Sequence, residues 1–271
     1  MVNSPKEITE NYINIGKGKC ALPFSKMFVL AILAGMFIGL AGLGATTAAV
    51  SITAASVAKF VGACIFPAGL IMVVLAGSEL FTGNCLIVIP VLEKEVTVDR
   101  MLRNWGIVYV GNFVGGMIIA AGAVFSHQLS LFSNGMAASV ISTAVAKCSM
   151  PFGDALLKGI FCNFLVCIAV WLGMAAKDAA GKMLGIFWPI MLFVLCGFEH
   201  SIANMYYIGA GLFAKTLPAY AEAAASAGID MTGLTWGNFL GANLLPVTIG
   251  NIIGGAAVGC AYWFVYKKNN K

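Results

Sequence analysis

Long apolar runs constrain the fold of this chain more than any other feature of its sequence. They fall at 27–50, 60–92, 105–125, 156–176, 185–214 and 236–265. Each is long enough to supply the ~20 residues that a helix needs to cross the hydrocarbon core of a bilayer. Only 10% of the residues are charged, whereas a soluble domain contains roughly 25%. The sequence therefore predicts an all-α membrane protein with six transmembrane helices.

Basic residues are distributed unevenly between these runs. Most of the 16 lie in the two tails and in the second and fourth connections: Lys6, Lys17, Lys19, Lys26, Lys94, Arg100, Arg103, Lys177, Lys182, Lys267, Lys268 and Lys271. The remaining connections hold Lys59, Lys147, Lys158 and Lys215. The positive-inside rule then places both termini in the cytoplasm. We expect a multi-pass protein of the cell inner or plasma membrane. Its net charge of +5 is explained by this orientation and does not indicate a nucleic-acid partner.

The cysteines lie mostly within the apolar runs, and they show no paired CxxC or Cys/His spacing. Such cysteines are interpreted as small buried hydrophobic residues. The pattern indicates no metal site, no disulfide framework and no cofactor.

Two of the runs are too long for a single straight span. Runs 60–92 and 185–214 contain about 30 residues, which as continuous helix would extend ~45 Å against a hydrocarbon core of ~30 Å. Glu79 interrupts the first, and Glu199 with His200 interrupts the second. A charge at membrane depth costs at least ~2.5 kcal/mol, so such residues face a cavity or the protein interior. We therefore predict a helix break in spans two and five.

The two interruptions also resemble each other. Gly77-x-Glu79-x4-Asn84 and Gly197-x-Glu199-x4-Asn204 share their spacing 120 residues apart. Further pairs keep the same order: Gly35-x-Phe37 with Gly159-x-Phe161, and Gly111-Asn112-x-x-Gly115-Gly116 with Gly250-Asn251-x-x-Gly254-Gly255. These pairs predict two three-helix repeats, about 27–125 and 156–265, within one channel domain, 1–271. Since each repeat holds an odd number of spans, the second is inverted in the membrane.

Inverted repeats with a broken helix in each half are typical of transporters and channels, where the breaks line the permeation path near the bilayer midplane. Irregular backbone is tolerated at that depth only where protein or water satisfies its polar groups. Helix N-termini at a break favour an anion.

Three segments resemble the signatures of a known family. They are Ala76–Gly83 (AGSELFTG), Gly159–Ala169 (GIFCNFLVCIA) and Gly197–Asn204 (GFEHSIAN). In this order, over six spans, they are similar to motifs of the formate/nitrite transporter family. The resemblance implies an aquaporin-like bundle, a homopentamer with one pore per protomer, and passage of small monovalent anions of weak acids: formate, nitrite, hydrosulfide, and sometimes lactate or acetate.

The resemblance also implies roles for individual residues. His200 matches the family's central histidine, Asn163 its partner on span four, and Thr82 the threonine of the segment that interrupts span two. Phe66, Leu70, Leu80 and Phe193 match two apolar constrictions, one on either side of the histidine. Lys147, which we expect in a loop, matches a lysine on the extracytoplasmic approach. By composition alone, Lys147 would be a solvated surface charge and the four apolar residues would belong to the packed core. His200 would be a core histidine whose hydrogen bonds are all made within the protein.

The expected mechanism follows from the cost of dehydration. A bare anion crosses an apolar constriction at a cost of many kcal/mol, whereas the neutral acid crosses easily. Lys147 would raise the local anion concentration. His200 would stabilise the anion as a cation or hydrogen-bond donor, or would relay a proton, and the sequence leaves open channel or proton-coupled transport. Glu199 is interpreted as structural, accepting hydrogen bonds from backbone N–H groups at the break or from Asn204, with Glu79 as its counterpart.

Other classes of function fit less well. A neutral-solute pore of the aquaporin type shares the inverted plan, but none of the eight prolines follows an asparagine, so no Asn-Pro-Ala motif is present. An enzyme is not expected, because the sequence contains neither HExxH nor Gly-x-Ser-x-Gly. Among the family's anions, the resemblance ranks hydrosulfide first, with formate and nitrite close behind.

Overall fold

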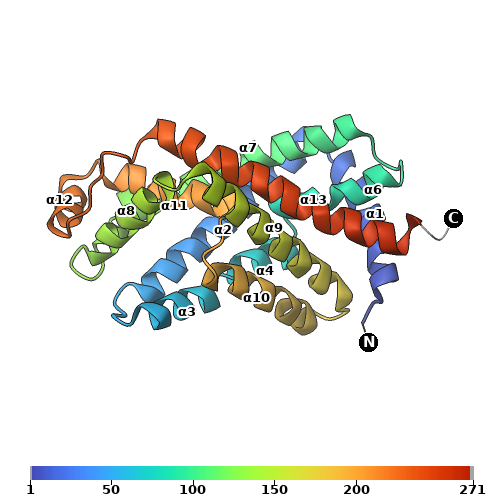
Figure 1. Cartoon of the computed structure of the whole chain (residues 1–271), viewed down its shortest axis with the longest axis horizontal. Helices are drawn as coiled ribbons and strands as arrows, with labels where there is room; N and C mark the ends of the chain where they lie inside the picture. The colour runs from blue at the N-terminus through green and yellow to red at the C-terminus, as the bar shows by residue number, and fades with distance from the viewer. Residues whose placement is uncertain (1, 269–271) are drawn as a thin grey trace.

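The structure, a computed structural model, describes residues 2–268 and consists of helices joined by short connections (Figure 1). Lys271, one of the basic residues counted above, lies outside the described residues. Four of the six expected spans are continuous: α2 (Phe24–Ala49), α7 (Val98–Phe125), α9 (Phe152–Ala175), and a π-helical turn (Asn238–Leu244) that continues as α13 (Leu245–Tyr266). By length and composition, each of these can cross a membrane.

Spans two and five are interrupted, as predicted. Span two consists of α3 (Ala55–Ile65) and α4 (Ala68–Leu75), a break at 76–80, and then α5 (Phe81–Asn84), a 3-10 turn (Cys85–Ile87) and α6 (Val88–Leu92). Span five consists of α10 (Ala179–Leu195), a break at 196–200 and α11 (Ser201–Ala214). Gly77 (φ +78°) and Gly197 (φ +70°) lie in the left-handed region, where a residue without Cβ meets no steric penalty. The prediction of two breaks is confirmed.

Three helices lie in segments that the sequence did not assign to helix: α1 (Pro5–Ala21), α8 (Gly135–Cys148) and α12 (Pro218–Ser226). Reciprocal hydrogen bonds between Ser4 and Glu7 cap the start of α1, which is a standard helix start signal. The expectation that Lys147 stands in a loop is wrong, because it lies in the last turn of α8. At 14 residues, α8 is too short to register as a span.

Close helix crossings reveal the repeat. In the first half, α2 and α7 approach so closely that a Cβ on Gly115 would overlap the carbonyl oxygen of Ile32. In the second half, Gly254 on α13 meets Ile160 on α9 in the same way. This register pairs Ala31 with Gly159. The sequence-based pairing of Gly35 with Gly159 is therefore wrong by one helical turn. Glycine recurs along the first span at the spacing of a helical turn, so the wrong glycine was paired.

Both chain ends lie at one end of the molecule, and α8 and α12 lie at the other (Figure 1). The backbone N–H of Asn3 donates to Ala175 O at 2.8 Å, next to the fourth connection. Lys17 pairs with Glu95 of the second connection at 2.7 Å, and Lys267 pairs with Glu10 at 3.7 Å. The segments rich in Lys and Arg thus share one end.

Candidate functional site

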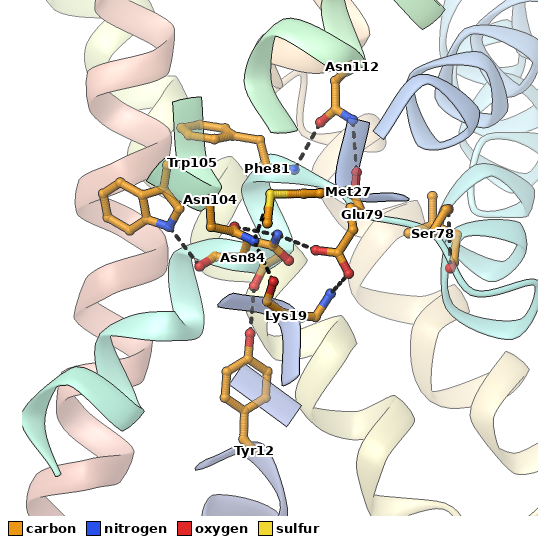
Figure 2. A network of polar contacts seen from close by, with 12 residues as sticks. Tyr12, Lys19, Met27, Ser78, Glu79, Phe81, Asn84, Asn104, Trp105 and Asn112 are labelled. Carbon is orange, nitrogen blue, oxygen red and sulfur yellow. Dashed lines mark hydrogen bonds and ion pairs between the residues drawn. The ribbon is translucent and has the colours of Figure 1, made fainter. Parts of the chain in front are cut away.

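The first break is held by a buried network of polar side chains (Figure 2). Glu79 accepts from Lys19 Nζ at 2.8 Å and from Asn84 Nδ2 at 2.7 Å. Asn84 Nδ2 also donates to Asn104 Oδ1 at 2.9 Å, and Asn104 Nδ2 donates to the backbone oxygen of Lys19 at 3.3 Å. The network joins α1, the break, α5 and α7.

Asn112 on α7 satisfies the backbone of the same break, as Figure 2 shows for two of its three bonds. Its Oδ1 accepts from Phe81 N at 2.9 Å, and its Nδ2 donates to Glu79 O at 2.9 Å and to Ala31 O at 2.7 Å. Broken backbone at membrane depth needs such partners. One asparagine therefore ties both sides of the break to α2.

The second break repeats this arrangement, with one additional hydrogen bond between the lysine and the glutamate. Glu199 accepts from Lys147 Nζ at 2.8 and 2.9 Å and from Asn204 Nδ2 at 2.6 Å. Asn204 Nδ2 donates to Asn243 Oδ1 at 2.8 Å, and Asn243 Nδ2 donates to Lys147 O at 2.9 Å. Asn251 then holds the backbone as Asn112 does.

The repeated bonds define which positions of the two halves are equivalent. Lys19 corresponds to Lys147, Glu79 to Glu199, Asn84 to Asn204, Asn104 to Asn243 and Asn112 to Asn251. The same register pairs Leu80 with His200, and both have extended backbone directly before the helix that follows the break, α5 or α11. The two halves therefore share one framework and differ at its centre, where one carries an apolar side chain and the other an imidazole.

His200 and Thr82 join the two broken spans. Thr82 Oγ1 lies 2.8 Å from His200 Nε2, and His200 Nδ1 accepts from the backbone N–H of Ala203 at 3.1 Å. A backbone N–H donates only to an unprotonated ring nitrogen. In the neutral imidazole the proton therefore lies on Nε2, which donates to the threonine oxygen. Asn163 Nδ2 donates to Thr82 O at 3.1 Å and to Asn251 O at 2.6 Å, fixing the threonine from α9.

Two cavities approach this centre from opposite sides. The first, of about 520 Å³, is lined by Lys59, Lys147, Glu199, His200, Phe66 and Phe193 among others. The second, of about 420 Å³, is lined by Lys19, Glu79, Lys182, Leu70 and Leu80 among others. Each cavity is lined by three Lys or Glu residues and by buried apolar side chains.

The four apolar residues singled out in the sequence divide between these cavities. Phe66 and Phe193 pack edge to face, with ring centroids 5.7 Å apart, and the Phe193 ring lies over His200 at 5.9 Å. Leu70 and Leu80 line only the second cavity. All four are at most 3% exposed, so the two cavities are separated by close-packed side chains.

Lys147 is not a solvated surface charge. Its side chain is 15% exposed, is paired with both carboxylate oxygens of Glu199, and lies 5.6 Å from the centre of the Tyr207 ring. Sequence reasoning missed its counterpart, Lys19, and the bridging residues Asn104 and Asn243. Asn112 and Asn251 stood in the repeated Gly-Asn motifs, so the recurrence of a polar residue among glycines was the signal that could have identified them.

Comparisons with known proteins agree with one another. The profile described as formate/nitrite transporter matches residues 6–264. The chain is 40% identical over 272 residues to the uncharacterized transporter YrhG of Bacillus subtilis, covering 98% of this chain and 95% of that protein. It is 37% identical over 250 residues to the formate channel FocA of Escherichia coli, covering 90% of this chain and 88% of that protein. A solved pentameric formate channel with formate bound has a TM-score of 0.80 and 32% identity, covering 90% of this chain and 98% of that one.

Proposed function

Because the chain belongs to the formate/nitrite transporter family, we propose that it conducts small monovalent anions of weak acids across the membrane, with formate as the first candidate. Nitrite and hydrosulfide follow as candidates of the same charge and similar size. The resemblance of the sequence motifs ranked hydrosulfide first, but FocA and the structural neighbour are named as formate channels. The observation that carries the proposal is a pair of lysine-lined cavities near one buried His200–Thr82 hydrogen bond: His200 lines the first, and Leu80 and Gly83, which flank Thr82 in the sequence, line the second.

The chemistry of the centre suits a weak acid. In the neutral imidazole, His200 donates through Nε2 to Thr82 Oγ1, which leaves the threonine hydroxyl proton to point toward an anion. An anion that accepts this hydrogen bond is partly compensated for its lost hydration. If the imidazole takes a proton from the aqueous solution and relays it to the anion, the anion leaves as the neutral acid and the imidazole returns to its neutral form. The neutral acid crosses an apolar constriction at much lower cost. We propose that Phe66 with Phe193 forms one collar, and Leu70 with Leu80 the other.

The assembly and orientation are also proposed. The solved neighbour is pentameric, and we infer a homopentamer with one path per protomer, surrounded by membrane lipid. The end that carries both termini and most Lys and Arg residues is assigned to the cytoplasm by the positive-inside rule. The cavity with Leu80 then opens to the cytoplasm, and the cavity with His200 opens to the opposite side.

Formate flux tests the function directly. We expect proteoliposomes that contain the full chain to take up formate down an imposed gradient at least about tenfold faster than protein-free liposomes of the same lipid, because an anion crosses bare hydrocarbon very slowly. Stopped-flow measurement of internal formate, with glycerol as a neutral solute, checks this. Fast glycerol uptake without formate uptake would instead indicate an aquaporin-like neutral-solute pore.

The collars are expected to set the size limit. Leu80→Ala and Phe193→Ala each remove a buried side chain from a constriction, so we expect the ratio of lactate to formate flux to rise roughly fivefold or more. Leu75→Ala is the matched control, because this leucine lies near the same break but is 41% exposed and lines neither cavity. Unchanged selectivity in both collar variants would remove these residues from the path.

A further inference from the structure

The paired lysines contribute little net charge to the cavities. Lys147 is neutralised by Glu199, and its counterpart Lys19 is neutralised by Glu79 at 2.8 Å. In each pair the carboxylate lines the same cavity as the ammonium. The opposite charges lie within 3 Å of each other, so an anion several ångströms away meets a dipole and not a net charge. The expected role of Lys147 in concentrating anions therefore needs another source of charge.

Each cavity contains one further lysine. In the first cavity this is Lys59, in the second turn of α3. In the second cavity it is Lys182, in the first turn of α10. Neither forms an ion pair within residues 2–268. Both lysines lie on the first helix of a broken span, α3 or α10, but three residues apart in the register that pairs Gly77 with Gly197.

The charges on the cavity walls can be counted. With the imidazole taken as neutral, the charged residues that line the first cavity are Lys59, Lys147 and Glu199, and those that line the second are Lys19, Lys182 and Glu79. Each wall therefore carries one net positive charge. That charge remains on Lys59 in one cavity and on Lys182 in the other, after the ion pairs cancel.

The position of Lys59 suits capture of an anion. Lys59 is exposed and lines the first cavity, and its Nζ lies 3.9 Å from the place that a Cβ on Gly197 would take, at the second break. An anion held by this ammonium would lie in the cavity whose floor is formed by His200 and Phe193. A cavity with low-dielectric walls focuses the field of such a charge.

We propose that Lys59 and Lys182 are the residues that concentrate the substrate anion, one at each mouth, and that Lys147 and Lys19 serve to hold the two breaks. This inference rests on the proposed function, because it concerns how the same anions reach the centre. Each side of the membrane would then have its own unpaired lysine that attracts anions.

Lys59→Gln tests the inference with the full chain in proteoliposomes. At low ionic strength, we expect the half-saturating formate concentration on the α8 side to rise about three- to tenfold, which is the scale of one unit charge a few ångströms from an anion. Maximal flux should stay within about twofold. Because salt screens the effect, the wild type and the variant should converge when sodium gluconate is raised to roughly 0.5 M.

Three comparisons make the test specific. Lys59→Arg keeps the charge and should match the wild type, and Lys182→Gln should raise the half-saturating concentration on the opposite side only. Lys6→Gln removes an exposed lysine that lines neither cavity and should change nothing. If the wild type conducts formate while Lys59→Gln keeps the same half-saturation at low salt, the inference is wrong and the proposed function stands. If the wild type conducts no small anion, both fail.

Discussion

Replacing Asn251 with alanine is expected to lower the melting temperature of the purified protein by roughly 10 °C or more. The Asn251 side chain is fully buried and bonds to Ser201 N, Glu199 O and Gly159 O at 2.9, 3.0 and 2.8 Å. Alanine leaves these three backbone groups without their partner. Each buried unpaired group costs about 1–3 kcal/mol, so the expected loss for the three groups is about 3–9 kcal/mol. Thermal unfolding in detergent, followed by tryptophan fluorescence, measures it.

The equivalent variant Asn112→Ala should behave alike, because Asn112 makes the same three bonds at the first break. Asn238→Ala is the matched control. Its side chain donates to Gly233 O at the surface, where water replaces the partner, so we expect a change below about 1 kcal/mol. If Asn251→Ala has the same melting temperature as Asn238→Ala, the stability of the break does not depend on the Asn251 side chain.

The broken spans could be predicted from sequence because two independent physical limits coincided. A helix of some thirty apolar residues is longer than the hydrocarbon core is thick. Glu79 and Glu199 each lie near the middle of such a run and require a polar environment there. Gly77 and Gly197 supplied the conformational freedom that a break needs, and both do lie at positive φ. Length, charge and backbone freedom all act locally, so they can be read from neighbouring residues.

The partners of those glutamates could not be predicted, because they are remote in the chain. Lys147 lies 52 residues before Glu199, and Lys19 lies 60 before Glu79. No periodicity links such positions. Their helices, α1 and α8, are too short to span a membrane, so hydropathy classed them with the connections.

The repeat was recognisable, but its register was not. Equivalent residues are 120 positions apart at the breaks, as with Glu79 and Glu199, but 139 apart at Asn112 and Asn251. The lengths of the connections differ between the halves, so no single offset aligns them. Identical letters then misled the comparison on the first span, where Ala31 and Gly159 are equivalent although their side chains differ.

His200→Leu is expected to reduce formate flux in proteoliposomes by about 10- to 100-fold. Leucine removes the donor that orients the Thr82 hydroxyl toward the anion, and a hydrogen bond to a charged group is worth about 1.5–3 kcal/mol. Leucine already occupies the equivalent position, Leu80, so the framework of the break should accept it. The variant should fold normally and lack only the polar centre. Stopped-flow uptake, with melting temperature as the check on folding, gives the result.

His200→Asn separates hydrogen bonding from proton transfer. Its amide keeps a donor and an acceptor but does not titrate. If the imidazole relays a proton to the anion, His200→Asn should retain flux within about tenfold of wild type at neutral pH while losing the wild-type dependence on pH. An internal pH dye should then report proton uptake with formate in the wild type and not in the variant.

Thr82→Val removes the hydroxyl that we propose donates to the anion. Removing the hydroxyl breaks the 2.8 Å contact with His200 Nε2 but leaves an imidazole whose Nε2 proton can reach the anion directly. We therefore expect a smaller loss of flux than in His200→Leu, with pH dependence retained. Wild-type flux and pH dependence in His200→Leu would show that anions pass without the imidazole. The apolar collars and the cavity charges would then have to account for conduction by themselves.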